Sequence, residues 1–276
     1  MKNIKVYQYI KWVIMPTIVL LMWQMLAISG WIQPTILPSP VAVVVRWFDY
    51  FLPYEAYNPE TSNWLMWSLS GELLHDAWAS IYRVIIGFLI GALLALPLGL
   101  WVGSSKIGND LMNPLIQFLR PIPPIAYIPL AMLWFGLGNP PAFFDKYRGF
   151  FPILINTIAG VRNVDGIYIL AARNLGAGQA TMFRRIILPA ATPYILTGMR
   201  VGIGTAFICV IVAEMIAVNS GVGYRILEAR EYMWSDKVIA GMFTIGFLGL
   251  VIDLCMDRLN RRLLRWHRGI ATEIPI

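Results

Sequence analysis

The amino-acid sequence predicts an all-α polytopic membrane protein, and three observations carry this prediction. Of its 276 residues, 58% are hydrophobic and only 13% are charged, whereas a soluble domain carries roughly 25% charged residues. The apolar residues fall into stretches about as long as a membrane-spanning helix. Lysine and arginine gather at the ends of these stretches, so membrane topology rather than nucleic-acid binding explains the net charge of +7.

About six transmembrane helices are predicted, forming a single domain over residues 1–276. They lie at about 12–29, 77–103, 114–137, 143–161, 195–218 and 238–259. Basic residues mark the connections on one side of the predicted membrane, and an arginine cluster follows the last span. Because basic loops stay in the cytoplasm, both termini are predicted to lie inside.

The first span follows three lysines. Residues near Ser29 resemble a signal-peptidase site, but the apolar run is long for a signal peptide, so we expect a retained helix. Residues 30–77 contain several prolines and far more acidic than basic residues, which predicts that they lie outside. A short amphipathic helix is predicted at 41–52, lying on the outer membrane surface.

The second span carries Arg83 near its outer end, where the side chain is predicted to reach the lipid headgroups. Small residues in this span and in the fifth span predict close contact between helices. These residues are Gly87, Gly91, Gly99, Gly103, Gly198, Gly202 and Gly204.

A cytoplasmic loop at 104–113 is predicted to lead into the third span, whose prolines prevent a regular helix. In lipid the freed carbonyl groups need partners, so this span is predicted to face protein or a water-filled cavity. The candidate path residues here are Arg120, Ile122, Pro123, Pro124 and Tyr127. A kinked helix that only packs against its neighbours is the alternative.

Charged residues also occur in the fourth and fifth spans. Asp145, Lys146 and Arg148 lie near the start of the fourth span. An Asp145–Arg148 ion pair or an anion-attracting vestibule would explain them, and Arg148 is kept as a path candidate. Glu214 lies near the outer end of the fifth span, where a path role, a cap or an ion pair is possible.

Residues 162–190 form a polar, basic segment between the fourth and fifth spans. Good helix formers precede Gly176 and Gly178, which allow a tight break. A second helical run follows, with apolar residues at three- to four-residue spacing. Pro189 and Pro193 are predicted to end this run and to start the next helix. The segment is therefore predicted to be a helix, a glycine hinge, a second helix and a proline elbow.

This segment resembles the EAA loop of binding-protein-dependent ABC importer permeases, with Leu170 where the family has glutamate. The matching residues are Leu170-Ala171-Ala172, Gly176 and Ile186-Ile187-Leu188-Pro189. The resemblance extends over nearly the whole chain. Residues 120–130 and 134–138 look most like the taurine, alkanesulfonate, nitrate and bicarbonate branch.

The resemblance implies a type I ABC importer permease fold in the bacterial inner membrane, with residues 30–77 in the periplasm. It implies a homodimer in the lipid bilayer, ABC ATPase subunits that dock on the cytoplasmic loop, and a periplasmic solute-binding protein. The coupling residues that it implies are Ala171, Ala172, Arg173, Gly176, Ala177, Phe183, Arg184, Leu188 and Pro189. The implied cargo is a small anionic or zwitterionic solute, taurine or another sulfonate first, with nitrate or bicarbonate as the alternative.

The sequence contains no phosphate-binding loop motif, so we expect ATP and Mg to bind a partner ATPase and no cofactor to bind this chain. Its isolated cysteines and histidines provide neither a metal-ligand spacing nor a catalytic constellation. We therefore expect a permease subunit that is not itself an enzyme. A secondary transporter or an intramembrane enzyme is the alternative, although inverted repeats and an intramembrane catalytic pair are not evident.

Overall fold

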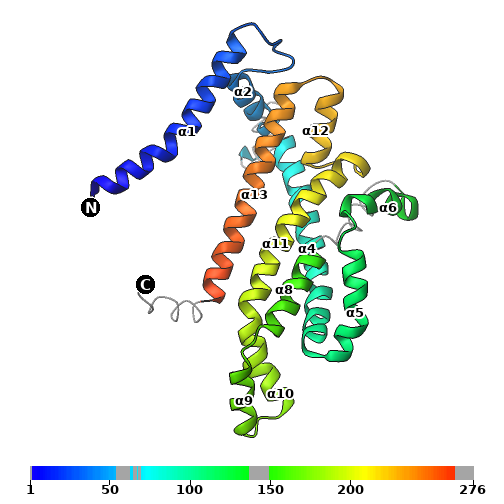
Figure 1. Cartoon of the computed structure of the whole chain (residues 1–276). Helices are drawn as coiled ribbons and strands as arrows, with labels where there is room; N and C mark the ends of the chain where they lie inside the picture. The colour runs from blue at the N-terminus through cyan, green and yellow to red at the C-terminus, as the bar shows by residue number, and fades with distance from the viewer. Residues whose placement is uncertain (1, 54–62, 65–66, 68–69, 137–148, 265–276) are drawn as a thin grey trace.

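The computed structural model describes residues 2–53, 63–64, 67, 70–136 and 149–264, and most of these residues are helical. The helices are, in chain order, α1 (Lys2–Ile28), α2 (Pro40–Phe51), α4 (Glu72–Ser104), α5 (Lys106–Leu119), η1 (Pro124–Tyr127), α6 (Ile128–Phe135), α8 (Phe150–Arg162), α9 (Gly166–Asn174), α10 (Gln179–Met182), η3 (Phe183–Ile187), α11 (Leu188–Ala217), α12 (Val222–Glu231) and α13 (Ser235–Leu263). In Figure 1 the long helices α4, α11 and α13 run alongside one another, while α1 projects away from them. The described residues contain no β-strand, and the predicted all-α class is confirmed.

Three helices are long and apolar enough to cross a membrane: α4, the continuous helix Gln179–Ala217, and α13. The pair α8 and α9 gives a fourth candidate span, bent by 55°. Shorter apolar helices at Ile14–Ile28 and Ile125–Phe135 fall on the first and third predicted spans. The described residues thus provide three or four full spans and two shorter apolar helices. The first part of the fourth predicted span, at 143–148, lies outside the described residues.

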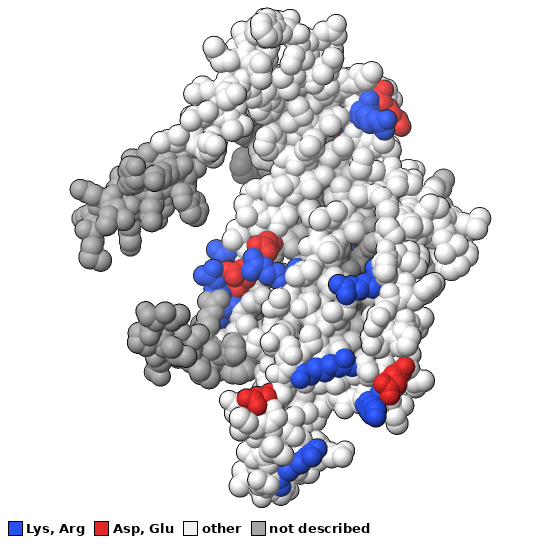
Figure 2. Space-filling view, in the orientation of Figure 1, with Lys and Arg blue, Asp and Glu red and all other residues white. Residues whose placement is uncertain are grey.

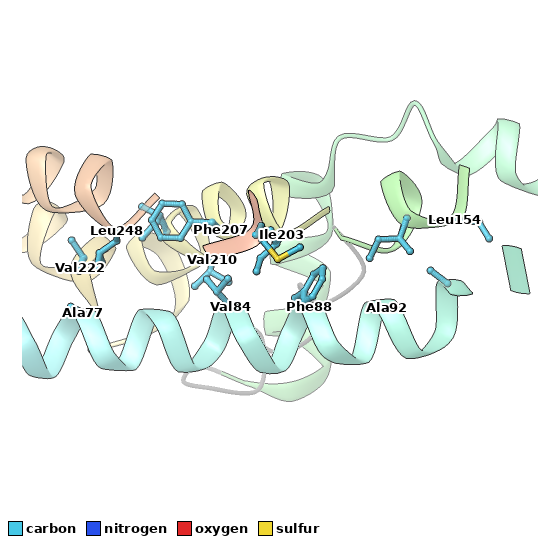
Figure 3. Packing of buried hydrophobic residues seen from close by; sticks show 14 of the residues in the cluster. Ala77, Val84, Phe88, Ala92, Leu154, Ile203, Phe207, Val210, Val222 and Leu248 are labelled. Carbon is cyan, nitrogen blue, oxygen red and sulfur yellow. The ribbon is translucent and has the colours of Figure 1, made fainter. Parts of the chain in front are cut away.

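Helix α4 is central to the hydrophobic core, and α8 and α11 pack along it. Figure 3 shows Val84 and Phe88 on the side of α4 that faces Phe207 and Val210 of α11. Leu154 of α8 is fully buried in the same cluster. Lipid tails are as apolar as these side chains, so close packing rather than water exclusion stabilises the part of this core that lies in the membrane.

The helix predicted at 41–52 is present as α2, whereas most of the loop predicted at 104–113 is helical. Helix α2 begins after Ser39, whose hydroxyl oxygen accepts a hydrogen bond from the Ala42 N–H at 3.2 Å. Ser105 caps α5 in the same way, accepting from the Gly108 N–H at 3.1 Å. This cap lets a new helix begin directly after α4, and it replaces the expected cytoplasmic loop.

Glycines let α4, α8 and α11 approach closely. A Cβ atom at Gly99 would lie 2.8 Å from the Thr157 Cβ, and one at Gly198 would lie 2.6 Å from the Asn156 Cβ. The predicted close contacts are confirmed for Gly99, Gly103, Gly198 and Gly202. The prediction was wrong for Gly204, which lies on the exposed face of α11 with no such neighbour within 4 Å.

Gly198→Leu is expected to loosen the contact between α8 and α11, because its Cβ would also lie 3.1 Å from the Pro152 carbonyl oxygen. Overpacking of this kind costs about 1–3 kcal/mol. Thermal unfolding in detergent, followed as loss of monodisperse protein, should therefore shift to lower temperature. Gly204→Leu is the matched control and should leave the midpoint unchanged. Equal losses for the two variants would contradict this account of the packing.

Candidate functional site

The segment after α8 has the predicted helix–glycine–helix shape, and Gly176 makes its turn. The Asp165 side chain caps the start of α9. At its end, the N–H of Gly176 donates to the Arg173 carbonyl at 2.9 Å, and the N–H of Ala177 donates to the Ala172 carbonyl at 3.0 Å. With φ of +78° at Gly176, these bonds form a Schellman end, which favours glycine at this position.

The predicted proline elbow is absent, because α10, η3 and α11 form one continuous helix, Gln179–Ala217. In the π-helical turn η3, the Leu188 N–H donates to the Phe183 carbonyl, five residues back. Pro189 follows in the first turn of α11 and has no N–H to donate. The wider π turn therefore accommodates this proline without breaking the helix. Pro193 also lies inside the helix.

Exposed apolar side chains cover the surface of α9 and the turn after it. Ile167, Tyr168, Leu170 and Leu175 are 69%, 63%, 60% and 87% exposed. Exposed apolar patches mark interaction sites on proteins, so this end of the molecule presents a surface suited to a partner. These four residues were missed as site residues, because none of them is among the coupling positions that the resemblance implied.

The predicted coupling residues all lie in this segment, at the end of the molecule where α9 and α10 sit together (Figure 1). Four of these residues are exposed, namely Ala171, Arg173, Gly176 and Arg184. Four are half-buried, namely Ala177, Phe183, Leu188 and Pro189, and Ala172 is buried. The motif thus contributes both buried and exposed side chains at this end of the molecule.

The proline-rich segment breaks the third predicted span into two helices. Arg120 caps the end of α5, and the Ile122 N–H donates to the Leu119 carbonyl at 3.2 Å. The next helical turn is η1, which starts at Pro124 and ends at Tyr127. Among the path candidates, Arg120 and Pro123 are exposed, whereas Ile122 and Tyr127 are half-buried. The candidate Arg148, with Asp145 and Lys146, lies outside the described residues.

Glu214, the other path candidate, is fully buried and belongs to an internal ion pair. Arg83 is 4% exposed and donates from Nη1 to Glu214 Oε1 at 2.6 Å. The Ser80 hydroxyl and the Gly223 N–H also donate to the Glu214 carboxylate. Arg83 donates further to the carbonyl and the hydroxyl of Ser220. The prediction that Arg83 reaches the lipid headgroups was therefore wrong: a buried carboxylate satisfies its charge.

A second buried carboxylate fixes α12 beside this pair. Asp76, which is 1% exposed, accepts hydrogen bonds from the Tyr50 hydroxyl at 2.8 Å, Arg225 Nε at 2.7 Å and the Gly221 N–H at 2.9 Å. Burial, together with the Asp76 charge, raises the pKa of Tyr50 above its ordinary value. Tyr50 therefore stays a neutral donor, and the two carboxylates join α2, α4, α11 and α12 into one unit.

A third group of charged residues is exposed on the sides of α11 and α13. The sequence analysis did not identify it as a candidate site. Arg200 of α11 donates from Nε and Nη2 to the two carboxylate oxygens of Asp253 of α13, at 2.7 and 2.6 Å. Its Nη1 lies 3.7 Å from Asp257. Figure 2 shows charged side chains gathered beside the C-terminal half of α13. The available signal was an arginine inside the span 195–218 and an aspartate inside 238–259, since ionisable residues in spans are functional candidates.

The fold is that of the type I ABC importer permeases, a class of polytopic transport subunits. It matches a permease chain in inward-facing structures of the MetNI methionine ABC transporter with a TM-score of 0.59 and 19% identity, covering 73% of this chain and 99% of the other. Residues 87–266 match the model of the family described as binding-protein-dependent transport system inner membrane component. The chain belongs to this family.

Three relatives place the chain within the family. It is 37% identical over 254 residues to SsuC of Escherichia coli, assigned to aliphatic sulfonate transport, with 92% and 90% of the two chains covered. It is 33% identical over 251 residues to the taurine permease TauC of Escherichia coli, covering 91% and 87%. It is 34% identical over 237 residues to the nitrate permease NrtB of Synechocystis, covering 86% and 82%. The chain is thus an ABC importer permease of the sulfonate, taurine and nitrate branch.

Proposed function

We propose that this permease carries a small anionic or zwitterionic solute, with taurine or another sulfonate first and nitrate or bicarbonate second. The observation that carries the proposal is the similarity to both a taurine permease and a sulfonate permease over about nine-tenths of the chain. The similar identity to a nitrate permease supports the second solute class.

The proposed assembly contains two copies of this chain in the inner membrane, two ABC ATPase subunits and a periplasmic solute-binding protein. ATP and Mg bind the ATPase subunits. The α9–α10 loop and both termini face the cytoplasm, and residues 30–77 face the periplasm. The exposed apolar residues of α9 support docking on an ATPase, and the basic ends of the spans support this orientation.

Coupling then follows from the continuous helix that leads out of the loop. Its 39 residues extend about 58 Å at 1.5 Å per residue. Because no elbow separates α10 from α11, a tilt imposed on the loop by ATPase closure is transmitted along the whole helix. The buried Arg83–Glu214 pair joins the far end of this helix to α4, so the tilt moves the outer segments with it.

The test is to purify the tagged chain with its cognate ATPase and to reconstitute both, with the binding protein, in liposomes. We expect the ATPase to be retained and labelled taurine to accumulate only when the binding protein and ATP are both present. Excess ethanesulfonate should compete with taurine, whereas nitrate should not. Accumulation of nitrate without taurine would establish the second solute class, and failure to retain any ATPase would overturn the proposed assembly.

A further inference from the structure

The long helix Gln179–Ala217 contains one turn that is not α-helical. Residues Phe183–Ile187 form the π turn η3, where the Leu188 N–H donates to the Phe183 carbonyl. Donor and acceptor are five residues apart in a π turn and four residues apart in an α turn, so η3 holds one extra residue. Such turns inside α-helices are frequent at functional sites. This one lies where the α9–α10 loop joins the spanning helix.

Pro189 by itself does not explain the π turn. A proline in a regular turn clashes with the carbonyl group four residues earlier, so a wider turn before Pro189 relieves that clash. Pro193, however, lies inside the same helix at a point where the residues around it are α-helical. This helix therefore accommodates a proline without an extra residue, and the π turn needs a second cause.

Packing on both sides of η3 provides that cause. Met182, before the turn, is 8% exposed, and Ala191, after it, is fully buried. Ala191 belongs to an apolar cluster with Val161 of α8 and Ile195 of α11. Each residue of an α-helix advances the chain by about 100° around the axis, so the same sequence in a regular helix would rotate Met182 by about 100° relative to Ala191. The π turn thus lets both residues stay buried.

The loop is also anchored at its other end, through α8. Helix α9 follows α8 after residues 163–165, and Asp165 caps its start. Helix α8 packs against α11, where a Cβ atom at Gly160 would lie 2.7 Å from the Tyr194 Cβ. Both ends of the loop are therefore held by one packed pair of helices. A rotation of α10 by about 100° would displace α9 and the apolar side chains that α9 exposes.

We propose that the extra residue of η3 orients the α9–α10 loop on the spanning helix, so that the exposed apolar side chains of α9 face the ATPase. The residues of η3 are positioning residues, because they act on docking through the direction of the loop around the helix axis. This inference rests on the proposed docking of an ATPase, and it identifies the element that orients the docking surface.

Changing the length of η3 by one residue in either direction tests this inference. Deletion of Arg185, which is exposed, lets η3 become a regular α turn while the helix faces on both sides keep their directions. Insertion of one alanine after Arg185 instead adds a rotation of about 100° that no turn absorbs. In a helix without a π turn, the deletion and the insertion would be equally disruptive. A difference between them is therefore the diagnostic result, and Arg185→Ala controls for loss of the side chain.

The first measurement is the amount of ATPase retained when each variant is purified. We expect the deletion to retain ATPase within about twofold of Arg185→Ala, and the insertion to retain at least about tenfold less, because losing one anchoring residue of an interface costs this much. Solute uptake in liposomes should follow the same order.

The second measurement reports the direction of the loop without the ATPase. Cys209 and Cys255 are replaced by serine, and spin labels are attached at Leu175→Cys on the loop and Ile107→Cys on α5, both at exposed positions. We expect the deletion to keep the distance found in the chain of normal length. The insertion should shift this distance by more than about 5 Å, because a helix is about 10 Å wide and its rotation moves a neighbour by a comparable amount.

Equal behaviour of the deletion and the insertion would overturn this inference. If both variants lose the ATPase, the chain length rather than the loop direction matters, and if both retain it, the loop direction does not matter. In either case, retention of the ATPase by the chain of normal length leaves the proposed function intact. If that chain retains no ATPase while the two distances differ as expected, the proposed docking fails and the orientation of the loop by η3 stands.

Discussion

Arg83→Gln should lower the free energy of unfolding by about 3–5 kcal/mol, because it leaves the Glu214 carboxylate buried without its cation. Unfolding in mixed detergent micelles at increasing denaturing-detergent fraction measures this loss. Arg46→Gln is the matched control, since its ion pair with Asp236 is 46% and 23% exposed. An exposed pair of this kind contributes less than about 1 kcal/mol.

The double variant Arg83→Met with Glu214→Leu separates the ion pair from the cost of an unpaired charge. Removing both charges should recover much of the stability lost in Arg83→Gln, because apolar replacements leave no buried charge without a partner. Uptake should stay low, since the hydrogen bonds from Arg83 to Ser220 are also lost. A loss in Arg83→Gln no larger than that in Arg46→Gln would contradict the buried pair.

Gly176→Val should weaken docking of the ATPase while the spanning helices stay folded. At φ of +78°, a non-glycine residue costs roughly 1–2 kcal/mol, and this lowers the population of the native turn about 5–30-fold. No atom that a Cβ would meet lies within 4 Å of it, so the backbone alone causes the loss within this chain. The amount of ATPase retained on purification and solute-stimulated ATP hydrolysis in liposomes both measure the effect.

Gly178→Val is the matched control in the same turn. Gly178 has φ of −67° and ψ of 163°, a conformation that valine adopts readily, and its Cβ would also meet no neighbour within 4 Å. We therefore expect Gly178→Val to retain much more ATPase than Gly176→Val. Equal losses would assign the effect to bulk in the docking surface rather than to the left-handed turn. Normal ATPase retention and uptake in both variants would show that this turn is not the coupling element.

Local chemistry allowed several features to be predicted from the sequence. The apolar stretches indicated the spans, since length and composition set whether a helix can cross a bilayer. Gly99 and Gly198 indicated close helix contacts, because only glycine admits a neighbouring helix at that distance. Gly176 indicated the turn after α9, because the left-handed region favours glycine. These features depend on one residue or one short run, so their neighbours in space were not needed.

Two errors, at Arg83 and at Pro189, had different structural causes. Arg83 was expected at the headgroups, but its partner is Glu214 on α11. Pro189 was expected to break a helix, but a π turn just before it keeps the helix continuous. In both cases the local preference was real, and a contact or a turn available only in the folded chain outweighed it.

The sequence by itself determined a helical membrane protein in which the loop between two spans turns at a glycine. Hydropathy, charge bias and glycine conformation are properties of single residues or short stretches, so they can be read without the tertiary structure. Only the tertiary structure decided which charges meet. It buried Glu214 and Asp76 in the core, and it brought Arg200 beside Asp253 on the exposed surface. The physical reason is that an ion pair needs atoms within about 4 Å, and packing of α11 against its neighbours, not spacing along the chain, fixes that distance.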